Sequence, residues 1–80
     1  MSYTIAQFEQ VHGNLIIDIS TSGNQYVVSI WDKEEHESTT KTFDSLKEAY
    51  GIFEKLVSWC VFGYYKDSDK KEFLRTGTMG

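Results

Sequence analysis

The stretch "STTKTFDSLKEA" (38–49) decides the fold, because its residue pattern changes from that of a strand to that of a helix. The first half is rich in β-branched threonine, which favours an extended strand over residues 38–43. The second half is a helix start: Asp44 or Ser45 can cap it, and the spacing of Ser45 and Glu48 fits a capping box. The sequence therefore predicts a strand followed directly by a helix.

The helix is predicted to run to about Phe62, because Gly63 is a natural stop. Upstream, short segments alternate apolar and polar side chains and are separated by turn-forming residues. The predicted strands are residues 3–10, 15–20, 25–32 and 38–43, with turns at 11–14, 21–24 and 33–37. Downstream, we expect a polar linker over 66–71 and one or two helical turns within 69–75.

These elements predict an α+β fold: a four-stranded antiparallel β-meander with one long helix packed across one face and a short C-terminal helical turn. The 80 residues form one domain, predicted over 1–75, with a flexible tail at 76–80. A chain this short buries only about 60% of the surface of its unfolded form. Support from a partner chain is therefore favoured.

The predicted helix carries more large apolar side chains than one helix face can bury. One stripe is expected to face the sheet: Leu46, Ala49, Tyr50, Phe53, Leu56, Val57, Cys60 and Tyr64, against Leu15, Ile17, Ile19, Tyr26, Val28 and Ile30. Trp59 extends that stripe along one flank, whereas Phe62 and Tyr65 fall on the polar side. Three arrangements would cover the excess: the helix turns Phe62 inward at its end, Phe73 and Leu74 cover it, or a partner does.

The second face of the sheet is also unusually apolar. It is predicted to carry Ile16, Val27 and Trp31, together with Ala6 and Phe8, where an open antiparallel sheet usually shows polar residues. Either the C-terminal segment covers this face, or Trp31 is an edge residue half-buried by its own neighbours, or the face is an interaction surface. Contiguous exposed apolar surface and tryptophan are both typical of interfaces.

Composition and motifs argue against nucleic-acid binding, catalysis and metal or phosphate binding. The formal net charge of −4 supplies no basic face for nucleic acid. Cys60 lies within the core stripe, away from both histidines, and the sequence has no metal-ligand spacing and no phosphate-binding glycine loop. We therefore expect a protein without catalytic activity, metal or cofactor. The acidic segment Asp32, Glu34, Glu35 and Glu37 is either a solvated loop or a docking element.

The cysteine content and the apolar segments of the sequence indicate the cellular location. A lone cysteine in an apolar setting is typical of a reducing compartment. The first ten residues show no basic region followed by an apolar run, and the apolar stretch 56–65 is far shorter than the ~20 residues of a membrane span. We expect a cytoplasmic protein that does not enter the membrane.

Residues 25–56 resemble the strand–hairpin–strand–helix layout of WGR domains. That family has a similar Phe-x-Ser-Leu-x-Glu-Ala helix start, here residues 43–49. The resemblance implies a DNA-contacting role for Trp31 or Lys33. Where the family has Trp-Gly-Arg, this chain has Trp31-Asp32-Lys33, and the segment Glu-Glu-His-Glu (34–37) that follows repels phosphate.

The leading hypothesis is a small acidic, non-catalytic module that docks on a larger protein with a basic surface. Phage-encoded inhibitors of host defence, anti-CRISPR proteins among them, are an analogous type, since they block basic channels by charge complementarity. The alternatives are a homodimer paired through the Trp31 face and a WGR-like nucleic-acid-associated domain. The candidate protein-binding residues are Trp31, Val27, Ile16, Asp32, Glu34, Glu35, Glu37, Trp59, Phe62 and Tyr65.

Overall fold

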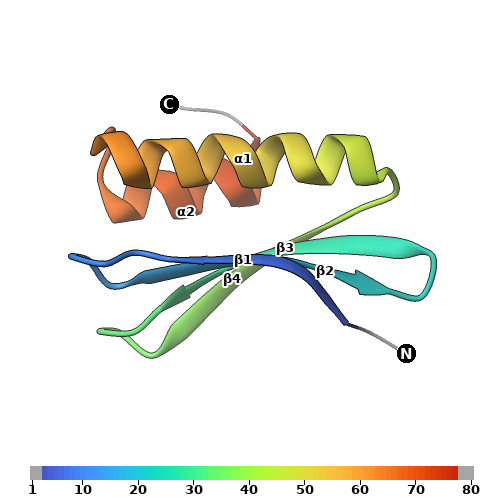
Figure 1. Cartoon of the computed structure of the whole chain (residues 1–80), viewed down its shortest axis with the longest axis horizontal. Helices are drawn as coiled ribbons and strands as arrows, with labels where there is room; N and C mark the ends of the chain where they lie inside the picture. Colours follow the sequence, from blue (N-terminus) through green and yellow to red (C-terminus); the bar gives the residue numbers. More distant parts are fainter. Residues whose placement is uncertain (1–2, 78–80) are drawn as a thin grey trace.

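The computed structural model describes residues 3–77, which form one antiparallel sheet and two helices (Figure 1). The strands lie in the order β1-β2-β3-β4. The elements are β1 (Thr4–Glu9), β2 (Leu15–Ser22), β3 (Gln25–Asp32), β4 (Glu37–Phe43), α1 (Leu46–Phe62) and α2 (Asp67–Thr76). The predicted α+β meander is confirmed, and the ends of the four strands lie within one or two residues of the prediction.

The ends of α1 follow from the residues that predicted them. Ser45 is the N-cap, and its Oγ accepts a hydrogen bond from the Glu48 backbone N–H at 3.3 Å. Gly63 is the C-cap with φ 75°, a left-handed conformation that glycine adopts without strain. Of the two capping candidates, Ser45 rather than Asp44 is therefore the cap.

The C-terminal helix is longer than predicted. Instead of a linker over 66–71 and one or two turns, α2 spans ten residues and begins directly after its N-cap, Lys66. Thr76 is the last residue of the helix and Gly77 its C-cap, while residues 78–80 of the predicted tail lie outside the described residues.

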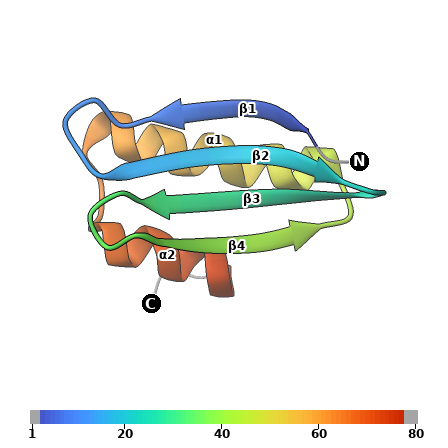
Figure 2. The same cartoon turned by 90° about the horizontal axis from the view of Figure 1, so that it is seen from below.

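Both helices lie on the same face of the sheet, and no described element covers the other face (Figures 1 and 2). α1 packs across β2 and β3, and α2 packs against β4. The core lies between these layers and consists of Leu15, Ile17, Ile19, Val28, Ile30, Phe43, Ala49, Phe53, Leu56, Cys60, Phe73 and Leu74.

Several side chains lie elsewhere than predicted. Ala6 and Phe8 are opposite Ile19 and Ile17 in the β1–β2 register, so they face the helices and pack against the core rather than sharing the Trp31 face. Within and after α1, the stripe is narrower than expected, since the side chains of Leu46, Tyr50 and Tyr64 are exposed. α2 packs over β4, so α1 packs mainly against β2 and β3.

Candidate docking surface

The face of the sheet opposite the helices, hereafter the open face, is built by the strand register. Cross-strand pairs Ile16–Trp31, Asp18–Ser29 and Ser20–Val27 lie at its centre, with Gln7 and Glu9 on β1 and Ser38, Thr40 and Thr42 on β4. The predicted residues Ile16, Val27 and Trp31 therefore do share one face. Trp31 is 37% exposed and its ring contacts His36 edge-on, while Ile16 and Val27 are half-buried by their neighbours.

Charge is divided unequally between the two faces of the molecule. Seven of the eight basic residues lie in the helices, at the α2 cap or on the helix-facing side of β4: Lys41, Lys47, Lys55, Lys66, Lys70, Lys71 and Arg75. The eighth, Lys33, forms an ion pair with Glu9 at 3.0 Å. The open face and the β3–β4 turn beside it hold four carboxylates, Glu9, Asp18, Glu34 and Glu35, against this single lysine. The open side of the molecule is therefore acidic.

Asp18 is the member of this set that sequence reasoning missed. It interrupts the apolar run "LIIDI" at a position whose alternation places it on the open face with Ile16. Its side chain is half-buried, and burial raises the pKa of the carboxyl above its usual value. Within residues 3–77, no hydrogen bond or ion pair forms on this carboxylate, so its charge is partly desolvated without a compensating partner.

Two of the predicted acidic site residues bind α2 instead: Asp32 is buried, and Glu37 is exposed. Oδ1 of Asp32 accepts hydrogen bonds from the backbone N–H groups of Glu34 and Glu35 at 2.9 and 3.1 Å, which closes the β3–β4 turn. Oδ2 of Asp32 lies 2.7 Å from Nζ of Lys71 on α2, and Glu37 contacts the same nitrogen at 3.1 Å. Hydrogen bonding to Lys71 holds the pKa of Asp32 below its usual value and raises the pKa of Lys71. Asp32 and Glu37 therefore anchor α2 to the sheet.

The remaining acidic candidates, Glu34 and Glu35, lie in the β3–β4 turn. Glu34 accepts a hydrogen bond from Nδ2 of Asn14 at 2.8 Å, which ties the β3–β4 turn to the β1–β2 turn at the same end of the sheet. Both Glu34 and Glu35 are exposed. The acidic turn is thus a fixed part of the border of the open face.

The aromatic candidates at the end of α1 form a separate surface in the helix layer. The ring of Trp59 packs edge-on against Phe73 and Tyr65, with centroid distances of 4.9 and 4.8 Å. Phe73 thus covers Trp59, but neither the helix end nor the C-terminal segment covers Phe62, which is 67% exposed. Tyr65 and the neighbouring Tyr64 are also exposed. This surface is mainly apolar, and Glu54 lines the same hollow as Phe62.

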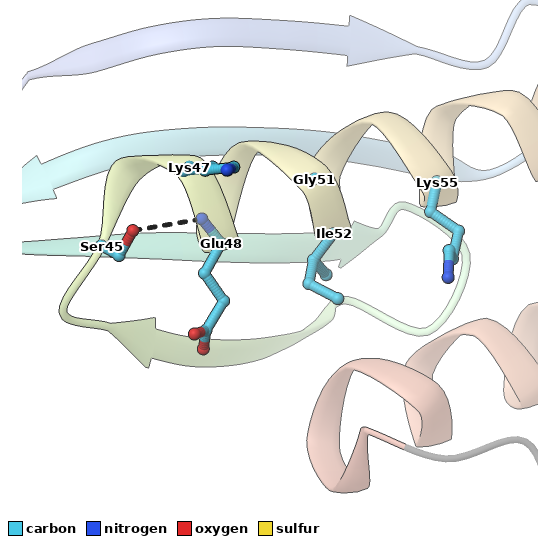
Figure 3. A pocket seen from close by; sticks show the side chains of 6 residues that line it. All are labelled: Ser45, Lys47, Glu48, Gly51, Ile52 and Lys55. Carbon is cyan, nitrogen blue, oxygen red and sulfur yellow. Dashed lines mark hydrogen bonds between the residues drawn. The ribbon is translucent and has the colours of Figure 1, made fainter.

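A shallow groove of about 530 Å³ runs along the N-terminal half of α1. Its lining is Ser45, Lys47, Glu48, Gly51, Ile52 and Lys55, and Figure 3 shows Glu48, Ile52 and Lys55 directed to the side where α2 lies. The side chains of Lys47, Glu48 and Lys55 spread apart in this view and make no hydrogen bond with one another. The groove presents no nucleophile beside a base, and no cluster of His, Cys, Asp or Glu within residues 3–77 is arranged to hold a metal ion.

Comparison with known proteins finds no matching family model, no similar curated protein and no similar solved structure. The resemblance to WGR domains thus gains no support from these comparisons. Among the helices of residues 3–77, none combines the length and apolar character that a membrane span requires.

Proposed function

We propose that this protein is a non-catalytic binding module that docks through its open face on a basic surface of a larger protein. The observation that carries the proposal is the segregation of charge: an uncovered sheet face with a half-exposed tryptophan is bordered by carboxylates, while seven of the eight cations lie on the helix side. Apolar anchors within a charged border are the usual composition of a protein interface.

The same charges weigh against the two alternatives. A homodimer through the open face would bring Asp18 and Glu9 of each copy close to those of the other, and like charges at an interface are costly. A nucleic acid would be repelled in the same way. An acidic face of this kind suits a partner that itself binds phosphate, which is the mode of phage-encoded inhibitors such as anti-CRISPR proteins.

Affinity capture from cells of the native host tests the proposal with two bait variants. The first combines Trp31→Ala, Glu34→Lys and Glu35→Lys, which removes the exposed indole and reverses the border charge. The second, Phe62→Ser with Tyr64→Ser, removes exposed aromatic rings from the helix layer and leaves the open face intact. Circular dichroism establishes that each bait is folded.

We expect the wild-type bait and the Phe62/Tyr64 bait to retain the same basic protein and to release it as the salt concentration is raised. The Trp31 bait is expected to retain none of it. Retention by the Trp31 bait and loss by the Phe62/Tyr64 bait would assign docking to the helix layer and contradict the proposal. Filter binding at low salt separates the WGR-like alternative, because retention of DNA by wild type would favour that role.

A further inference from the structure

The centre of the open face holds a carboxylate and an indole ring at neighbouring positions. Asp18 is directly opposite Ser29 in the β2–β3 register, and Trp31 follows Ser29 by two residues on the same face. Asp18 and Trp31 are therefore diagonal neighbours, a relation that places such side chains roughly 7–8 Å apart, within reach of one further group between them. Ile16, opposite Trp31, completes the floor of this site.

Within residues 3–77, no cation forms an ion pair with the Asp18 carboxylate. The lysines and the arginine of the helices lie behind the sheet, and Lys33 is already paired with Glu9. Because the carboxylate is half-buried, it has lost part of its hydration without gaining an ion pair. A cation that arrives from the open side would restore that lost interaction.

We propose that Asp18 and Trp31 form a seat for an arginine side chain of the partner protein, with the guanidinium between the carboxylate and the indole ring. The proposal rests on the proposed function, whose docking face it refines. Arginine fits better than lysine because its planar group forms paired hydrogen bonds with a carboxylate and stacks on an aromatic ring. The half-exposed Trp31 ring and the hydroxyl of Ser29 offer further contacts from the same face.

A titration followed by NMR tests the seat with two acetylated, amidated tripeptides, Gly-Arg-Gly and Gly-Lys-Gly. The chain has two tryptophans, so two indole N–H signals report separately on the open face and on the α1–α2 contact; Trp31→Phe assigns them. We expect the arginine peptide to shift the Trp31 signal and to leave Trp59 unchanged. The lysine peptide is expected to bind about tenfold more weakly, a difference that corresponds to ~1.4 kcal/mol.

Two variants with the same loss of charge distinguish the seat from general acidity. Asp18→Asn is expected to weaken arginine-peptide binding about tenfold, whereas Glu54→Gln, at an exposed position of α1 on the helix side of the sheet, is expected to leave it unchanged. Equal weakening by both variants, equal binding of both peptides, or no shift of Trp31 would each overturn the seat. If the seat fails in this way while the Trp31 bait still loses the captured partner, the proposed function stands without it.

Discussion

The replacement Lys71→Met tests what fixes α2 to the sheet. Nζ of Lys71 lies 2.7 Å from Asp32 and 3.1 Å from Glu37, and the side chains of Lys71 and Asp32 are only 11% and 7% exposed. Methionine has a similar length and preserves most of the packing, but it leaves the Asp32 carboxylate buried without its cation. The backbone N–H groups of Glu34 and Glu35 remain as partners of that carboxylate.

The cost follows from this geometry. Removing one partner of a buried ion pair typically costs about 3–5 kcal/mol, and the two surviving hydrogen bonds place Lys71→Met near 3 kcal/mol. A chain of this length has a total stability of about 4–12 kcal/mol at ~0.05–0.15 kcal/mol per residue. With a urea m-value of about 1 kcal/mol/M, the unfolding midpoint should fall by roughly 3 M.

Urea unfolding followed by circular dichroism measures this loss, and a double-mutant cycle with Asp32→Asn isolates the pair. The pKa of Asp32 is lowered on folding, so the pair stabilises the protein above the unfolded pKa of 3.8 and loses that contribution as pH falls through the folded value. In Lys71→Met, the free energy of unfolding should therefore decrease less steeply than in wild type as the pH is lowered. A cost below about 1 kcal/mol, which is the range of exposed ion pairs, would refute the buried anchor.

Other predictions concern single residues. Gly51→Ala should stabilise the protein by about 0.5–1 kcal/mol, because the added methyl group lies in open space on a helix. Gly63→Ala should destabilise it by roughly 1–2 kcal/mol, because alanine is strained at φ 75°. The urea midpoints of the two variants should therefore shift in opposite directions. Burial raises the pKa of the Cys60 thiol, so iodoacetamide should label it slowly until urea unfolds the chain. Burial also raises the pKa of Asp18, so Asp18→Asn should be the more stable protein at pH 7, and thermal melts at about pH 3 should no longer separate the two.

The elements that the sequence predicted well are those whose signals are local. Ser45 and Gly63 cap α1 through contacts within one helical turn, and the alternation of the strands directly sets which residues face the helices. The width of the buried stripe on α1 depends instead on contacts between elements that are distant in the sequence. Helical spacing predicts Tyr50 in the core stripe, but its side chain is 37% exposed, because α1 shares the sheet with α2 and buries a narrower face.

The length of α2 is underpredicted from the sequence because two of its four buried residues are lysines. Phe73 and Leu74 are apolar, but Lys70 and Lys71 are buried as well, a pattern that resembles a solvated linker in sequence. The partner that permits the burial of Lys71 is Asp32, which is 39 residues away along the chain. Lys70 is satisfied by the carbonyl of Tyr65, whose position depends on how the chain turns after α1. No short window of sequence contains the Lys71–Asp32 pair.

The two aspartates of the central strands show how the open face acquires its charge. Asp32 faces the helices and binds Lys71, so its charge is neutralised within the chain. Asp18, one strand away, faces the opposite side, where the single lysine is bound to Glu9. Because both helices lie on one side of the sheet, they supply cations to one face only. Within residues 3–77, Asp18 thus lacks the compensation that Asp32 receives from α2. A basic partner docked on the open face, as we propose, would supply it.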